Sequence, residues 1–342
     1  MKLVTISTFW NCEEYVQECI QSLKNQYYTD FIAYFIDDVS TDNSFEIAKK
    51  TIGDDKRFIL IKNTEKKYKT KNFIDVVNNN PKIKWNDVII EIDGDDKLSD
   101  NHVLGLINKT FMDKDIWICG TRWKDIQGRL GNYGKPIPEK ARSTTWNFSH
   151  MRSYRAFLFR SIKEEHLKFE GEFFKAACDL GFAIPMLEMS GSEHFKYINE
   201  PLYTYHWHDR QTYSDMNSFG DRTLQGRIAK HIYSLPKYDQ ISLIDENQNI
   251  TITPEIKKTS MEIMMESLSN SKPFNPQKKY NHPNYDIINN VLNLQKVYHP
   301  SNNIKPKQEN KPSNRNEIFE LKKGTLMEQN YRMFGGNKKS RY

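Results

Sequence analysis

The sequence predicts an α/β fold in which a mainly parallel central sheet is flanked by helices and followed by a polar C-terminal appendage. Short apolar runs alternate with segments whose apolar residues recur at helical spacing, and clusters of aspartate follow two of the runs. From about residue 236 the composition shifts to Asn, Lys, Pro and Ser. Strands that alternate with helices form a parallel sheet covered on both faces, so these patterns favour this fold class.

Five apolar runs are the expected strands of the sheet. They lie at residues 3–8, 31–36, 58–61, 88–92 and 115–121. After the first run, Asn11 is a candidate helix cap, and the helix itself is predicted by the spacing of Tyr15, Val16, Cys19, Ile20 and Leu23. Further helices are expected at residues 45–50, 73–77, 154–162 and 172–189.

The chain, with 342 residues, is long enough for one domain with a full α/β core and a smaller appendage. We expect the core domain at residues 1–235, in two halves at 1–125 and 126–235, and an extension at 236–342. The mean hydropathy of −0.76 is low for a globular enzyme. Because the extension has too little apolar surface to offset its ordering entropy, we expect it to be partly helical or disordered. Its amphipathic islands lie at residues 256–268, 285–297 and 317–327.

The composition predicts an intracellular protein. No run of about eighteen apolar residues occurs, so no transmembrane segment is expected, and the N-terminus lacks a signal leader. The four cysteines form no C-x-x-C pair, which suggests neither a disulfide framework nor a zinc site. The net charge of +6 could attract phosphates, anionic membranes or acidic glycans, although much of the lysine excess lies in the extension. We expect a cytoplasmic location, in the host cytoplasm if the chain is viral.

Two acidic motifs follow expected strands. Asp-Gly-Asp-Asp at residues 93–96 follows the fourth strand, and Asp-Asp at residues 37–38 follows the second. In open α/β sheets, ligands bind beyond the carboxyl ends of the strands, where such loops converge. Carboxylates there could hold Mn2+ or Mg2+, a hard cation that neutralises a diphosphate leaving group. A solvated turn and a helix cap are the structural alternatives for the two motifs.

The first strand ends in Thr8-Phe9-Trp10-Asn11, which presents polar and aromatic groups near the same crevice. The indole of Trp10 could stack on a nucleobase, or it could be a half-buried packing residue.

The order of these motifs resembles family 2 glycosyltransferases of the GT-A fold. That family typically shows variants of S-x-Y-N, D-D-x-S-T-D and D-x-D-D, and residues 8–11, 37–42 and 93–96 occupy comparable positions here. The resemblance covers roughly the first hundred residues well and extends more weakly to about residue 214. It implies a GT-A nucleotide-diphospho-sugar transferase fold, with a nucleotide-sugar-binding half followed by an acceptor half. The implied reaction moves a sugar from a UDP-sugar, or another nucleoside-diphosphate sugar, to an acceptor hydroxyl.

The resemblance also implies roles for residues of the donor half. Asp38 would bond to uracil, and Lys71 would approach the base or the phosphates. Trp10 replaces the usual Tyr, and Val39 replaces the usual Gly, which leaves the geometry of that turn open. Asp93 and Asp95 would form the D-x-D pair. The full donor set is Thr8, Phe9, Trp10, Glu14, Asp38, Lys71 and Asp93, and the manganese or magnesium ligands are Asp95, Asp96 and His208.

In the acceptor half, Asp179 resembles the catalytic base of the family, where an E-D pair opens a helix, with Cys178 in place of the Glu. In an inverting transfer a carboxylate takes the proton of the acceptor hydroxyl, so Asp179 is the candidate base. Residues 203–208 resemble the Y-R-x-H segment, in which the spacing favours His208 over His206 as a ligand of the metal or the diphosphate. The remaining candidates for acceptor or diphosphate contacts are Arg152, Arg155 and His206.

Other functional classes fit the sequence less well. A dinucleotide-dependent dehydrogenase needs a Gly-rich turn after the first strand, and residues 7–10 contain no glycine. An aspartyl phosphatase would carry its Asp-x-Asp motif on the opening strand. The alternative is a nucleic-acid-binding protein, or a glycosyltransferase acting on a modified base in DNA, because the chain is basic and carries Arg152, Arg155 and Arg160. The acceptor, whether glycan, protein or nucleic acid, is not identified by the sequence.

Overall fold

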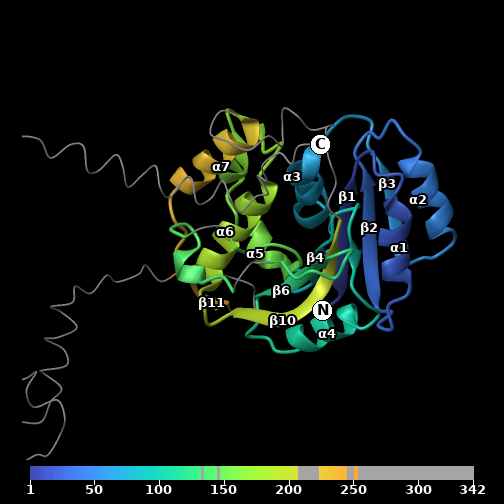
Figure 1. The fold of residues 1–342 in the computed structure, drawn as a ribbon. Helices are drawn as coiled ribbons and strands as arrows, with labels where there is room; N and C mark the ends of the chain where they lie inside the picture. Colours follow the sequence, from blue (N-terminus) through green and yellow to red (C-terminus); the bar gives the residue numbers. More distant parts are fainter. Residues whose placement is uncertain (132–134, 145–146, 207–222, 245–249, 253–342) are drawn as a thin grey trace, which may run out of the picture. The chain divides into compact units, whose positions relative to one another are not determined.

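The computed structural model describes residues 1–131, 135–144, 147–206, 223–244 and 250–252. In this part of the chain an eight-stranded mixed sheet is the centre of the fold (Figure 1). In spatial order its strands are β3 (Phe58–Lys62), β2 (Phe31–Asp37), β1 (Leu3–Phe9), β4 (Val88–Glu91), β7 (Arg152–Arg155), β6 (Ile118–Asp125), β10 (Phe195–Tyr205) and β5 (Lys97–Leu98). Only β7 and β5 run against the other strands of the sheet. The predicted α/β fold with a mainly parallel sheet is confirmed.

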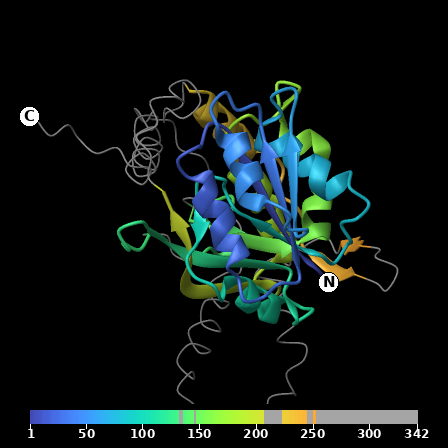
Figure 2. The same ribbon diagram turned by 90° about the vertical axis from the view of Figure 1, so that its right-hand side faces the viewer.

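Both faces of the sheet are buried, because alternate residues of β1, β2 and β4 enter opposite hydrophobic cores. On β1, Leu3 packs into one core, whereas Val4 and Ile6 pack into the other. Figure 1 shows the corresponding helices on opposite sides of the sheet, and α1 and α2 lie in front of it in Figure 2. Removing this apolar surface from water stabilises the layered arrangement by about 25 cal/mol per Å². The first core contains residues of α1 (Val16–Lys24), α2 (Ser44–Ile52) and α4 (Val103–Phe111), and the second contains residues of α5 (Ala156–Arg160), α6 (Cys178–Ser190) and α7 (Leu224–Ser234).

The middle of the chain differs from the sequence prediction. A helix was expected from residue 154, but residues 152–155 form β7, which pairs antiparallel with both β4 and β6. The helix α5 then begins at Ala156. The predicted helix at residues 172–189 begins only at Cys178, since residues 172–173 form β9 of a short hairpin with β8 (Lys168–Phe169). The helix expected at residues 73–77 is the π-helical turn η1 (Ile74–Asn78), which follows α3 (Tyr68–Phe73).

The described chain continues beyond residue 235 with an antiparallel pair, β11 (Ile241–Ile244) and β12 (Ile250–Ile252). The side chain of Ile241 is only 1% exposed and belongs to the core that contains α6. A buried ion pair between Arg142 Nε and Glu188 Oε1 (2.7 Å) lies nearby, and Glu188 Oε2 accepts from the amide of Tyr238. Residues up to 241 therefore pack with the preceding domain. The domain division at residues 235 and 236 stays a prediction, and the three amphipathic islands lie outside the described residues.

Within the described residues, no helix combines the length and hydropathy that a bilayer crossing requires.

Candidate functional site

The two acidic motifs meet at the carboxyl end of β1. The amide of Asp38 donates to the carbonyl of Phe9 (2.9 Å), and the amide of Gly94 donates to the carbonyl of Thr8 (3.3 Å). Parallel pairing of β1 with both β2 and β4 places the two turns on either side of the same strand end. The crevice expected from the strand order is therefore built from these loops.

Glycine at position 94 is required by this close approach. A Cβ atom there would lie 2.5 Å from Phe9 Cβ and 3.1 Å from the carbonyl oxygen of Thr8. Two buried thiols support the same turn, since Cys12 Sγ donates to the carbonyl of Gly94 and Cys19 Sγ to that of Asp93. The absence of a side chain at Gly94 thus allows this turn to pack directly against the end of β1.

Asp93, Asp96 and His150 form a group that could hold a metal ion. One ligand atom of each residue lies within 4.8 Å of the others. The imidazole of His150 stacks on the rings of Tyr203 (centroids 5.0 Å apart) and Tyr205 (5.4 Å), which fixes its orientation. The sequence analysis selected Arg152 and Arg155 from the run at residues 150–155 but did not assign His150 to the metal. The missing information was β7, the short strand that brings the run beside β4.

The electrostatic environment of Asp93 and Asp96 favours the binding of a divalent cation. Burial and the charge of Asp93 raise the pKa of Asp96 well above its usual range. Asp96 Oδ2 accepts from the hydroxyl of Tyr203 (2.8 Å), and Asp96 Oδ1 accepts from the amide of His206 (2.8 Å). Two like charges held this close are stabilised by a hard cation, and two carboxylates with an imidazole are ordinary ligands of Mn2+ or Mg2+.

A charged cluster adjoins these ligands, formed by Lys69 and Arg152 with Glu91, Asp93 and Asp179. Lys69 Nζ lies 2.9 Å from Asp93 Oδ1, 2.8 Å from Asp179 Oδ1 and 3.5 Å from Glu91 Oε2. Arg152 is 1% exposed, and its Nη2 atom lies 2.9 Å from both Glu91 Oε2 and Asp179 Oδ1. The cluster joins the metal-ligand group to the candidate base.

Asp179 enters the charged cluster from the first turn of α6. Burial raises the pKa of its carboxyl, but the positive charges of Arg152 and Lys69, with a smaller contribution from His150, outweigh this effect. The pKa of Asp179 therefore lies well below its usual range. The carboxylate is ionised at neutral pH and is a weak base while both cations remain in contact with it.

The end of the crevice that the sequence predicts for the donor contains Asp38. Its Oδ1 accepts from Asn63 Nδ2 (2.8 Å) and the amide of Lys67 (2.9 Å), and its Oδ2 accepts from the amide of Tyr68 (2.9 Å). This carboxylate therefore orders the loop between β3 and α3. The bond to uracil assigned to Asp38 stays a prediction.

Trp10 stands at the same end, and Lys66 Nζ lies 3.9 Å from the centroid of its indole ring. Burial lowers the pKa of Lys66 to about 8, although the carboxylates of Asp38 and Asp37 act in the opposite direction. The contact is a cation–π interaction on the aromatic face of Trp10, which the sequence analysis proposed as a stacking surface for a nucleobase.

The structure brings together Asp93, Asp96, Asp179, Arg152 and His206 from the predicted set. It adds Lys69, Glu91 and His150. For Lys69 the sequence held no clear signal, because the side that it faces depends on a helix start at Tyr68 that the apolar spacing did not indicate.

Several predicted residues lie away from the charged cluster. Lys71 Nζ instead pairs with Asp75 Oδ1 of η1 (2.7 Å). Arg155 pairs with the start of β4, at the opposite end of β7, where its guanidinium donates to the carbonyls of Phe111 and Ile116.

Three further predicted residues lie in the described part of the chain. The ring of Phe9 packs in a hydrophobic core, Glu14 is exposed before α1, and Asp95 is partly buried but is not in the metal-ligand group. His208 lies outside the described residues. The roles predicted for these side chains stay predictions.

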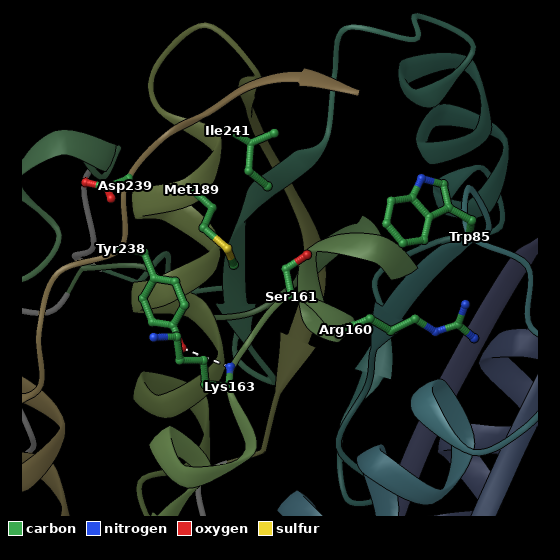
Figure 3. Close-up of a pocket in the computed structure, with 8 residues that line it drawn as sticks. All are labelled: Trp85, Arg160, Ser161, Lys163, Met189, Tyr238, Asp239 and Ile241. Atoms are coloured by element: carbon green, nitrogen blue, oxygen red, sulfur yellow. Dashed lines mark hydrogen bonds between the residues drawn. The ribbon is translucent and has the colours of Figure 1, made fainter. Parts of the chain in front are cut away.

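A separate cavity of about 400 Å³ has a lining that includes Trp85, Met189 and Tyr238 (Figure 3). Arg160 also lines it, but its guanidinium donates to the carbonyls of Val77 and Ile83. None of the predicted site residues lines this cavity. Its lining is largely apolar but also includes Lys163 and Asp239.

Comparisons with known proteins identify a matching family and several structures with a similar fold. Residues 5–167 match the family described as Glycosyl transferase family 2. No curated protein sequence matches the chain. The crystal structure of S. aureus TarS residues 1–349 in complex with UDP-GlcNAc has 16% sequence identity, a TM-score of 0.48, and coverage of 64% of this chain and 62% of that one.

A second similar structure is the mannosyltransferase PcManGT from Pyrobaculum calidifontis in complex with GDP-Man and Mn2+. It has 14% identity, a TM-score of 0.43, and coverage of 62% of this chain and 59% of that one. The aligned region thus spans less than two thirds of either of these two chains.

Proposed function

Because residues 5–167 match glycosyl transferase family 2, we propose that the protein moves a sugar from a UDP-sugar, or a related nucleoside-diphosphate sugar, to an acceptor hydroxyl. The observation that carries the proposal is the meeting of two distant acidic turns at the end of β1, beside three potential metal ligands. A nucleotide sugar needs both elements, a pocket for its base and a cation for its diphosphate.

We assign Asp93, Asp96 and His150 to the divalent metal, Mn2+ or Mg2+, with Asp95 as the further ligand that the family resemblance suggests. When bound, such a cation supplies Lewis-acid stabilisation of the departing diphosphate. Tyr203 and the amide of His206 hold Asp96 by hydrogen bonds and so orient it toward the group. Outer contacts of this kind fix the geometry and basicity of metal ligands.

We assign the nucleotide to the edge formed by Thr8, Trp10 and the Asp38 turn. Trp10 offers an aromatic face, and the loop that Asp38 orders closes the pocket beside it. Lys71 is assigned to the phosphates, which requires its ammonium group to leave Asp75.

We assign general-base catalysis to Asp179, with direct displacement and inversion at the anomeric carbon. Both of its ion pairs use Oδ1, so we assign the proton of the acceptor hydroxyl to Oδ2. Arg152 and Lys69 keep the carboxylate ionised and hold it in position. The basicity of Asp179 rises when either cation moves away during turnover.

A thermal-shift screen of nucleotide sugars, each with and without Mn2+, tests the proposal. Ligands that bind the folded state raise the melting temperature, so we expect a UDP-sugar to do so and Mn2+ to enlarge the shift. Hydrolysis of the same donor, measured as released UDP, then tests the chemistry before any acceptor is known. The proposal is wrong if no nucleotide sugar stabilises the protein and none is hydrolysed with either metal.

A further inference from the structure

The ammonium group of Lys69 occupies a position between the metal-ligand group and the candidate base. It contacts Asp93, Asp179 and Glu91, and its side chain is 16% exposed. These three carboxylates can accept all three of its N–H donors. In the absence of a metal ion, Lys69 therefore neutralises part of an acidic site that would otherwise repel itself.

A metal ion bound to Asp93 would lie close to the ammonium group of Lys69. Lys69 Nζ contacts Asp93 Oδ1, and His150 Nδ1 lies 3.7 Å from Asp93 Oδ2, so the carboxylate is approached from both sides. A divalent ion coordinated by Asp93 and Asp96 would lie within a few ångströms of a positive charge. Repulsion between like charges at that separation is large in a partly buried site.

Lys69 and Arg152 differ in their freedom to move. Arg152 is 1% exposed and is bound on two sides, by Glu91 and by the carbonyl of Phe148. Lys69 reaches the charged cluster through a flexible four-carbon stem and has a compact ammonium head. When a positive charge arrives at Asp93, Lys69 is therefore the group that can withdraw.

We propose that Lys69 is an internal counter-ion that competes with the divalent cation for Asp93, and that the diphosphate of the donor relieves this competition by accepting the ammonium group. This inference rests on the proposed function, because it requires the metal and the nucleotide to share the site. It predicts that the metal binds weakly to the free protein and more tightly once nucleotide is present. The arrangement couples metal binding to donor binding through a side chain of the protein.

The test measures Mn2+ binding to the full chain by electron paramagnetic resonance of the free ion, with and without UDP. Three proteins are compared: the wild type, Lys69→Met and Lys67→Met. Lys67 is a matched control, since it has the same charge at a nearby position but its Nζ pairs with Asp75 Oδ2 (2.9 Å). Lys69→Gln is a second variant, which retains polarity if the methionine destabilises the fold, and melting curves without metal show which variants are folded.

Without UDP, we expect Lys69→Met or Lys69→Gln to bind Mn2+ about tenfold more tightly than the wild type, because a competing charge is removed. Lys67→Met should match the wild type. UDP should tighten Mn2+ binding to the wild type more than to the Lys69 variants, because only the wild type has the ammonium group to relocate.

The outcomes separate this inference from the proposed function. If the wild type binds Mn2+ with UDP, but the Lys69 variants bind the free ion no more tightly than the wild type does, the inference is wrong and the proposed function stands. The same holds if Lys67→Met tightens binding as much as Lys69→Met, since the effect would then be one of net charge. If no protein binds Mn2+ even with UDP, both the metal assignment and the inference are wrong.

Discussion

The hydroxyl of Tyr203 donates a hydrogen bond to Asp96 Oδ2 across 2.8 Å and so connects residues that are 107 positions apart in the chain. The same hydroxyl accepts a hydrogen bond from the amide of Asp93 (3.0 Å). One buried phenol on β10 thus contacts both the carboxylate of Asp96 and the backbone of Asp93. The arrangement links β10 to the turn after β4.

Tyr203→Phe is expected to weaken Mn2+ binding about tenfold, since partners of metal ligands are typically worth about 10- to 100-fold in affinity. The phenylalanine keeps the ring that stacks on His150 but leaves Asp96 Oδ2 and the Asp93 amide without this partner. Calorimetric titration of Mn2+ in the presence of UDP measures the effect. Tyr197→Phe, at the far end of the same strand, is the control, and equal Mn2+ affinity in all three proteins would contradict the orienting role.

The fold could be predicted from the sequence where buried apolar residues form runs or recur at regular spacing. Strands β1 to β4 are apolar runs, and the two acidic motifs were expected at two of their ends. The strand β7 was missed because it reads Arg-Ser-Tyr-Arg, with no apolar run. Arg152 can be buried in it only because Glu91 and Asp179 supply compensating charges, and both lie far away in the sequence.

The sequence predicted the aspartates and Arg152 of the candidate site but not Lys69. Lys69 and Lys71 are separated by two positions, and a helix directs them to different sides. The side that each faces depends on where α3 begins, and the apolar spacing indicated only a later helix at residues 73–77. The family resemblance selected Lys71, whereas tertiary packing brings Lys69 to Asp93.

Asp96→Asn and Asp95→Asn distinguish two assignments of the metal ligand. The sequence assigned both residues to the metal, but only Asp96 belongs to the group whose ligand atoms lie within 4.8 Å of one another. We expect Asp96→Asn to reduce Mn2+-dependent UDP release by about 100-fold or more, because loss of a stabilising charge at a developing anion is worth several kcal/mol. Asp95→Asn should lose much less. A larger loss in Asp95→Asn would transfer the main ligand role to Asp95.

Asp179→Asn should retain binding of the UDP-sugar and lose turnover, by about 10²- to 10⁴-fold, the usual contribution of a general base. Asparagine is nearly isosteric and can still accept a hydrogen bond from Lys69 or Arg152, but it cannot take the acceptor proton. Donor affinity is measured by calorimetry and turnover by sugar transfer or donor hydrolysis. Losses of equal size in binding and turnover would show instead that Asp179 supports the structure of the site.

The ion pairs of Asp179 should also make stability depend on pH. The folded pKa of this carboxyl is lowered, whereas the unfolded pKa is about 3.9, so its contribution to stability is present above that value and is lost as the pH falls toward the folded pKa. The wild type should therefore exceed Asp179→Asn in melting temperature at neutral pH, and the difference should shrink on acidification below about pH 4. A difference that is constant from neutral to acidic pH would indicate that these ion pairs contribute no net stability.

Val39→Gly is expected to stabilise the protein. Val39 has a φ of 67°, a left-handed conformation in which a β-branched residue is strained by about 1–3 kcal/mol. The strain is maintained because the amide of Asp38 bonds to Phe9 and the amide of Ser40 donates to Asp37 Oδ1 (3.2 Å), which fixes both sides of the turn. Glycine relieves the strain but costs about 0.5–1 kcal/mol in unfolded-chain entropy, so we expect a net gain of about 1 kcal/mol in the free energy of unfolding.

Urea unfolding at pH 7 measures this gain, and Val39→Ala is the matched control. Alanine removes nearly the same side chain but keeps the Cβ atom that disfavours the left-handed region. The glycine variant should therefore be the more stable of the two. If alanine stabilised the protein as much as glycine, the strain would lie in the packing of the valine side chain, and the backbone at the Asp38 turn would be relaxed.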